Sequence, residues 1–179
     1  MIREIAARRY GEAAFQIARD SGREERWSEG LSLMAAVFSD LEMAALMREA
    51  RISTADKLAL VERSLPGVDP LALNLARLLV HRGRTALAPQ IAEAFQELLD
   101  AERGIAHALV TTAVPLSDSE AKAVAEKLSE ISGKQVVVER QVDESIIGGL
   151  VARIGDNLID GSTRSQLTAL KRRLREARA

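Results

Sequence analysis

The spacing of the apolar residues changes near residue 104, and this change limits what the chain can fold into. Before that point apolar residues recur every three or four positions, as Trp27, Leu31 and Met34 do. Such spacing places them on one face of an α-helix. After it, residues 105–114 read IAHALVTTAV, a run rich in β-branched residues that is followed by a proline and therefore indicates a strand. The sequence predicts an α+β protein whose helical part comes first.

Helix-starting and helix-ending residues divide the first part into about six helices. Asp69 followed by Pro70 is typical of an N-cap with proline in the first turn. Gly83 suits the position after the last turn of the same helix, because glycine adopts a left-handed backbone at no steric cost. We expect a six-helix bundle over residues 1–104, joined to the second domain by a short hinge or a shared helix.

Residues 105–179 are expected to form a small mixed α/β domain with about four strands and two helices. Ser117 and Glu120 have the spacing of a capping box, and the helix that they open should stop at Gly133. Strands are expected at 135–142, 147–154 and 158–159, with a final helix from residue 163.

Glycine and aspartate gather between residues 148 and 161, and we interpret them as a structural motif. A glycine pair within a strand is typical of a bulge or of a close backbone approach. Glycine followed by aspartate suits a hairpin turn, and a glycine before the last helix would allow a positive φ there. The residues of this motif are Gly148, Gly149, Gly155, Asp156, Asp160 and Gly161.

The composition argues against several classes of function. A net charge of −1 and the absence of cysteine give no bulk attraction to nucleic acid and exclude thiolate chemistry. No apolar run approaches the roughly 20 residues that span a bilayer, and no secretory signal is recognised at the N-terminus. His81 and His107 lie in different predicted domains without ligand partners at suitable spacing. We therefore expect no catalytic residue, metal, cofactor or membrane insertion.

The first helix has more apolar surface than packing on one side requires. One arc of it holds Ile2, Ala6, Tyr10, Ala13, Ala14 and Ile17. Ile5 and Phe15 lie on either flank of this arc, so the apolar surface is wider than the usual stripe of about 100°. This pattern fits either a central helix packed on all sides or a helix with one flank left for a partner's amphipathic helix.

The last segment, residues 163–179, is basic, with six basic residues and one acidic residue. A narrow apolar seam runs along it through Leu167, Leu170 and Leu174. The segment is either a solvated basic helix end or a docking surface for an acidic or helical partner. An RNA-binding factor of the antitermination type is an alternative function, although no aromatic residue lies among these arginines to stack on a base.

Three segments resemble a known family. Residues 142–174, VDESIIGGLVARIGDNLIDGSTRSQLTALKRRL, resemble the C-terminal motif of the δ subunit of bacterial F-type ATP synthases, whose mitochondrial counterpart is the oligomycin-sensitivity-conferring protein. Residues 7–18, ARRYGEAAFQIA, and 111–120, TTAVPLSDSE, resemble the family's opening and middle segments. Gly11 departs from the family, which more often has alanine; from the sequence alone this departure affects helix stability by about 1 kcal/mol.

The resemblance implies a non-catalytic stator subunit, which links the catalytic head to the peripheral stalk so that rotor torque drives ATP synthesis. It implies a peripheral location on the cytoplasmic face of the inner membrane. Domain 1–104 would bind the N-terminal helices of α subunits, and domain 105–179 would bind peripheral-stalk b subunits. The implied α-subunit contacts are Tyr10, Ala13, Ala14, Ile17, Asn74, Leu75, Leu78 and Leu79. The implied b-subunit contacts are Leu167, Leu170, Arg173 and Leu174.

Overall fold

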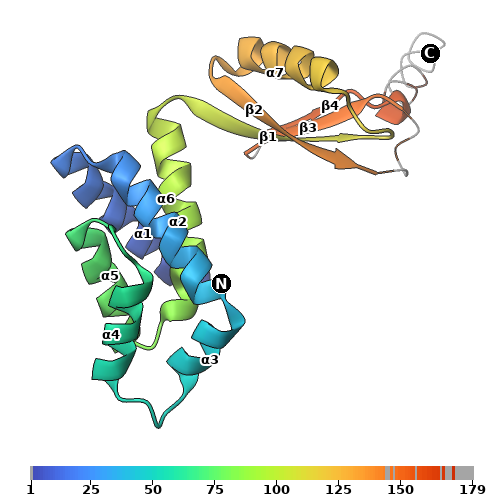
Figure 1. Ribbon diagram of the computed structural model, residues 1–179. Coiled ribbons are helices and arrows are strands. Elements are labelled where there is room, and N and C mark those ends of the chain that lie inside the picture. Colours follow the sequence, from blue (N-terminus) through green and yellow to red (C-terminus); the bar gives the residue numbers. More distant parts are fainter. Residues whose placement is uncertain are drawn as a thin grey trace. The chain divides into compact units, whose positions relative to one another are not determined.

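The computed structural model (Figure 1) describes residues 2–143, 146, 148–155, 157–165, 167 and 171. The chain divides into two compact units, Met1–Leu99 and Asp100–Ala179, which are described separately here. This division falls inside a helix, ahead of the change of apolar spacing near residue 104. The class is α+β, as expected, with a mixed sheet of four strands.

Helices account for the first unit. They are α1 (Ile2–Ser21), α2 (Glu24–Ser39), α3 (Leu41–Arg48), α4 (Thr54–Ser64), α5 (Pro70–His81), the 3-10 turn η1 (Thr85–Leu87) and α6 (Ala88–Glu102). Asp69 caps α5 by accepting a hydrogen bond from the backbone N–H of Leu71 at 2.9 Å, with Pro70 in the first turn. Gly83 has a φ of 60° just after the helix. Both ends of α5 therefore confirm the prediction.

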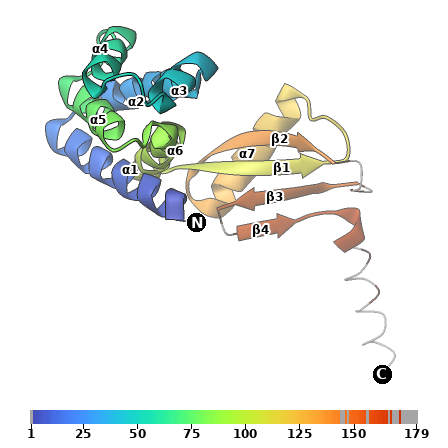
Figure 2. The same cartoon turned by 90° about the horizontal axis from the view of Figure 1, so that it is seen from below.

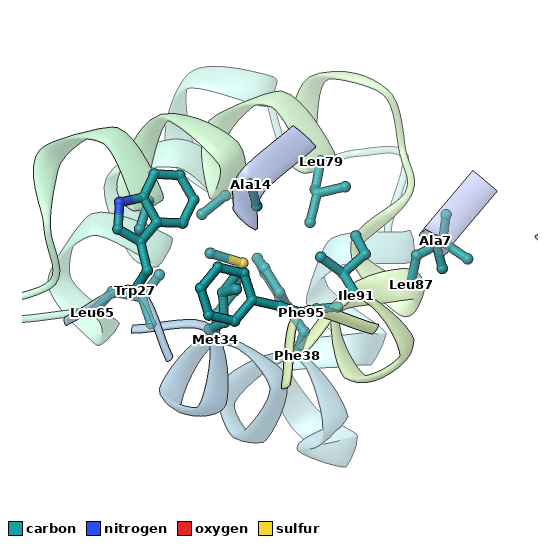
Figure 3. Close-up of a cluster of buried hydrophobic side chains, with 14 of the residues drawn as sticks. Ala7, Ala14, Trp27, Met34, Phe38, Leu65, Leu79, Leu87, Ile91 and Phe95 are labelled. Atoms are coloured by element: carbon teal, nitrogen blue, oxygen red, sulfur yellow. The ribbon is translucent and has the colours of Figure 1, made fainter. Parts of the chain in front are cut away.

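Aromatic rings stand at the centre of the helical core (Figure 3). The ring of Phe95 stacks on Trp27 with centroids 6.4 Å apart and meets Phe15 edge-on at 5.6 Å. Trp27 and Met34 are 1% and 0% exposed. Because α1, α2 and α6 each contribute a ring, this cluster ties the first helix of the unit to the last. Truncating one of these rings to alanine would cost about 3–5 kcal/mol.

At Gly11 the backbone of α1 lies very close to α6. A Cβ atom built at Gly11 would lie 2.8 Å from the Cβ of Ala94 and 3.2 Å from the backbone oxygen of Ile91. Real Cβ atoms essentially never lie that close to a neighbour. The expectation that Gly11 affects only helix stability is therefore wrong, because this glycine also permits the contact between two helices.

The second unit is a sheet with the strand order β2-β1-β3-β4. Its elements are β1 (Ile105–Thr112), α7 (Asp118–Ser132), β2 (Gln135–Val142), β3 (Leu150–Ile154) and β4 (Asn157–Asp160). Strand β1 runs parallel to β2 and antiparallel to β3, and β4 pairs antiparallel with β3. Helix α7 connects the two parallel strands and covers one face of the sheet (Figures 1 and 2). It buries Leu128 against Ala108, Val110 and Val136.

The predicted helix signals in this unit are confirmed. The Ser117 side chain accepts from the backbone N–H of Glu120, and the Glu120 carboxylate accepts from the backbone N–H of Ser117 at 2.9 Å. Gly133 follows α7 with a φ of 68°. Helical backbone resumes at Thr163.

The glycine motif is structural, but two of its details differ from the prediction. Strand β3 begins at Leu150, so Gly148 and Gly149 precede the strand instead of lying within it. Gly149 has a φ of 83°, and a Cβ there would lie 2.4 Å from the backbone oxygen of Gly161. The predicted positive φ at Gly161 is wrong. A Cβ at Gly161 would lie 3.3 Å from the backbone oxygen of Leu150, which is a tight contact, and the Gly161 N–H donates to the same oxygen at 2.9 Å.

The remaining turn of the motif agrees with the prediction. Gly155 has a φ of 54° in the turn that joins β3 to β4, whereas Asp156 lies outside the described residues. Within the described part of the chain no single helix is long and apolar enough to cross a membrane. Helices α2 and α3 reach the required length and hydropathy only when they are taken together, and the chain bends by 77° between them.

Candidate partner-binding site

Helix α1 has a buried face and an adjacent exposed flank. The buried face consists of Ala7, Gly11, Ala14, Phe15 and Ala18. Beside it runs a second row with helical spacing, which we call the α1 stripe: Ala6, Tyr10, Ala13 and Ile17. Ala13 is exposed, and Ile17 is 45% exposed. Ala6 and Tyr10 are half-buried and pack against the helical core, so the core covers the α1 stripe only in part and leaves Ala13 and Ile17 accessible.

Helix α5 repeats this arrangement. Its buried face consists of Ala72, Ala76, Leu79 and Val80. On one flank lies the α5 stripe, which we define as Leu71, Asn74, Leu75 and Leu78. Leu71 and Leu78 are 42% and 40% exposed, whereas Leu75 is half-buried. Leu75 packs in part against the helical core, so Leu71 and Leu78 supply the accessible apolar surface of this flank.

Two contacts show that α1 and α5 run antiparallel. Near the middle of α1, the Tyr10 hydroxyl accepts a hydrogen bond from Nη1 of Arg84, just beyond the end of α5, at 3.2 Å. Just beyond the end of α1, Nη1 of Arg23 donates to Oδ2 of Asp69, the N-cap of α5, at 3.0 Å. At about 100° per residue, both stripes lie on the same rotational side of their buried faces. In neighbouring antiparallel helices such flanks either face each other or point apart, and the contact of Tyr10, a residue of the α1 stripe, with Arg84 indicates that they face each other. The two stripes therefore border one shared surface.

Asp69 holds one end of this arrangement through its charge. Its side chain is 2% exposed, whereas that of Arg23 is 45% exposed. Burial by itself raises the pKa of Asp69, but the hydrogen bonds from Leu71 and Arg23, together with the Arg23 charge, outweigh burial and lower the pKa. The carboxylate therefore stays ionised, and it joins the turn after α1 to the start of α5.

The structure brings together six of the eight side chains expected to contact an α subunit. Those on the stripes are Tyr10, Ala13, Ile17, Asn74, Leu75 and Leu78. Ala14 and Leu79 are only 3% and 0% exposed, so they offer no side-chain surface to a partner and belong to the core. Sequence reasoning did not include Leu71, which is exposed on the α5 stripe. Its position three, four and seven residues before the other members of the α5 stripe is the signal that could have identified it.

The second unit presents the start of its last helix. Asp160 accepts from the backbone N–H of Ser162 at 2.9 Å and from the Ser165 hydroxyl at 2.6 Å. The hydrogen bond from Ser165, followed by those from Ser162, lowers the pKa of Asp160. Leu167 is 58% exposed. The other three residues predicted to contact a b subunit, Leu170, Arg173 and Leu174, lie outside the described residues.

The histidines have structural surroundings. His107 on β1 lies 2.9 Å from Oδ2 of Asp100 through Nε2 and 3.6 Å from Oε1 of Glu139 through Nδ1. His81 is exposed in the last turn of α5, where a cation would interact favourably with the helix dipole. Among the described residues no group of three or more His, Asp or Glu side chains could hold a metal ion. The described surface does offer apolar helix flanks, which are typical of proteins that bind other polypeptides.

Comparisons with known proteins identify the family. The family model for the ATP synthase delta (OSCP) subunit matches residues 6–174. A protein of Gemmatimonas aurantiaca named ATP synthase subunit delta is 39% identical, over 98% of this chain and 96% of the relative. Another, from Thioalkalivibrio sulfidiphilus, is 38% identical over 90% and 91% of the two chains. The present chain belongs to the ATP synthase delta (OSCP) subunit family.

A solved structure agrees in fold. A chain of the Toxoplasma gondii mitochondrial ATP synthase hexamer superposes with a TM-score of 0.66, covering 94% of this chain and 96% of that one at 22% identity. The alternative of an RNA-binding factor receives no support from any of these relatives.

Proposed function

We propose that this protein is the stator subunit that joins the catalytic head of an F-type ATP synthase to its peripheral stalk. Membership of the delta family, together with the exposed stripes on α1 and α5, supports this function. The subunit performs no catalysis and lies at the cytoplasmic face of the membrane as a peripheral component. Because rotor torque would otherwise turn the head, its two contacts must dissociate slowly.

The six helices act as one bundle that receives the N-terminal helix of an α subunit across both stripes. Ile17, Leu71 and Leu78 are 45%, 42% and 40% exposed. Covering each of them would contribute up to about 1 kcal/mol, since burying a whole aliphatic side chain contributes about 1.5–3 kcal/mol. Asn74 accepts a hydrogen bond from Arg77 at its amide oxygen, so its N–H groups can donate to a polar group of the partner.

The second unit holds the peripheral stalk through the helix that follows the glycine motif. Asp160 fixes the start of this helix through Ser162 and Ser165, and Leu167 presents apolar surface on it. Leu170, Arg173 and Leu174 continue the same helical spacing in the sequence, and we propose that they meet the b subunits. Domain 1–104 thus binds the head, and domain 105–179 binds the stalk.

Isothermal titration calorimetry tests the head contact. The probe is a synthetic peptide of the N-terminal segment of the α subunit from the same organism, added to the full chain. We expect binding by the natural protein and a loss of at least about tenfold in affinity for Ile17→Asp, because the change places a charge in an apolar contact. Leu41→Asp is the matched control, since Leu41 is 83% exposed on α3, away from both stripes. Equal affinities of the two variants would refute the assignment of the stripes.

The stalk contact has an analogous test. Leu167→Asp should weaken binding to the soluble part of the b subunits, whereas Leu158→Asp on β4, where the side chain is 64% exposed, should leave it unchanged. Unchanged binding by Leu167→Asp would show that the stalk docks elsewhere on the second unit.

A further inference from the structure

A cavity of about 690 Å³ lies at one end of the two stripes. Its lining comes from α1, α3, the end of α5 and η1, and it includes Ala6, Arg48 and Arg84. Ala6 belongs to the α1 stripe, and Arg84 donates to the hydroxyl of Tyr10, another member of that stripe. The cavity is therefore continuous with the surface on which we propose that a helix docks.

The cavity is partly apolar, and its charged groups are mostly cationic. Ala6, Met47, Val80 and Leu87 supply apolar surface. Two arginines, Arg48 and Arg84, oppose one glutamate, Glu4, which leaves one net positive charge. Glu4 already has an interaction of its own. Because guanidinium groups pair with carboxylates in fixed two-pronged geometry, this lining suits the carboxylate side chains of a bound segment.

The opposite end of the same surface carries the Arg23–Asp69 ion pair and one further carboxylate, that of Asp20. Asp20 follows Ala13 by seven residues on α1 and is exposed, so it lies on the same flank near the end of that helix. A helix lying along the stripes thus meets arginines where α1 begins and α5 ends, and a carboxylate where α1 ends. The charge of this surface therefore differs between its two ends.

We infer that the Arg48–Arg84 cavity receives the acidic end of the docked amphipathic helix and thereby fixes the direction in which that helix lies. This inference rests on the proposed head contact, and it names a specificity determinant that the stripes alone do not provide. The apolar stripes supply affinity without direction, because leucine and isoleucine side chains accept either orientation of a helix. The cationic cavity supplies the direction, since the reversed helix would place its carboxylates beside Asp20.

The test measures the same α-subunit peptide in two forms, the natural sequence and one whose glutamates and aspartates near the acidic end are replaced by glutamine and asparagine. Calorimetry with the full chain compares the natural protein, Arg48→Gln and the control Arg63→Gln, an exposed arginine on α4. We expect Arg48→Gln to lower the affinity for the natural peptide by about fivefold and to leave the affinity for the glutamine- and asparagine-substituted peptide unchanged. The salt dependence of binding should also decrease. The control should bind both peptides as the natural protein does.

A second measurement determines in which direction the bound peptide lies. A photo-crosslinking residue at the acidic end of the peptide should attach to residues 84–90, and one at the other end should attach near Ile17 or Asp20. If the natural protein binds but Arg48→Gln has no effect and crosslinks appear at both ends equally, the cavity plays no part and the head contact stands alone. If the natural protein binds neither peptide, the proposed head contact fails and this inference fails with it.

Discussion

Replacing Gly11 by alanine has two opposite effects on the free energy of unfolding: a gain in helix propensity and a steric clash with α6. In an exposed helix the change from glycine to alanine stabilises by about 1 kcal/mol. Here the new Cβ would meet the Cβ of Ala94 at 2.8 Å and the backbone of α6 at 3.2 Å, and neither group can swing away. Forcing an extra methyl group into a packed contact costs about 1–3 kcal/mol. We therefore expect Gly11→Ala to lower the free energy of unfolding by up to about 2 kcal/mol, or roughly 8–16 °C in Tm for a unit of about 100 residues.

The measurement is urea denaturation followed by Trp27 fluorescence. Trp27 is the single tryptophan of the chain and is 1% exposed in the helical core, so it reports on this unit alone. The matched control is the double variant Gly11→Ala with Ala94→Gly, which removes the clashing atom. The double variant should be more stable than the sum of the two single changes implies, by about 1 kcal/mol or more. A Gly11→Ala protein that gains about 1 kcal/mol would refute the close approach of α1 to α6.

Two further predictions concern the ends of α5 and the glycine motif. The folded-state pKa of Asp69 is lowered from its ordinary value of 3.8, so its stabilisation is present above the unfolded-state pKa and is lost as the pH falls through the folded-state pKa. Asp69→Asn should cost about 1–2 kcal/mol at neutral pH and flatten the acid limb of a stability–pH curve measured with Trp27; an unchanged acid limb would contradict this. Gly149→Ala should destabilise the second unit by at least about 1–3 kcal/mol, because its φ is 83° and its Cβ would meet the Gly161 oxygen at 2.4 Å. Hydrogen exchange at the amides of β3 measures this loss of stability. Gly155→Ala is the control and should destabilise less, because the space around its Cβ position is open.

Local signals in the sequence predicted those elements that are stabilised by neighbours along the chain. The Asp69–Pro70 cap and the capping box of Ser117 and Glu120 form between residues a few positions apart, so spacing alone identifies them. The change from helical to strand periodicity near residue 104 likewise depends on local pattern. These signals were sufficient for the class of the fold and for the ends of α5 and α7.

Long-range contacts decided the details that the sequence could not predict. Ala13 and Ala14 are adjacent alanines, and packing of the whole buried face of α1, including Gly11 against Ala94 and Phe15 against Phe95, turns Ala14 toward the core. The start of β3 depends in the same way on Gly161, twelve residues beyond Gly149. The cavity of Arg48 and Arg84 could not be predicted either, because α1, α3, α5 and η1 each contribute part of its wall.

Two contacts join α1 to α5: that of Arg84 with Tyr10 near the middle of α1, and that of Arg23 with Asp69 just beyond its end. Both contacts form within the free chain, so α1 and α5 are already joined before the proposed partner helix would dock, which reduces the ordering that docking would require. A stator subunit experiences repeated torque. Because α1 and α5 are joined to each other, a force on a helix bound between them would act on the whole helical unit and would not separate the two helices.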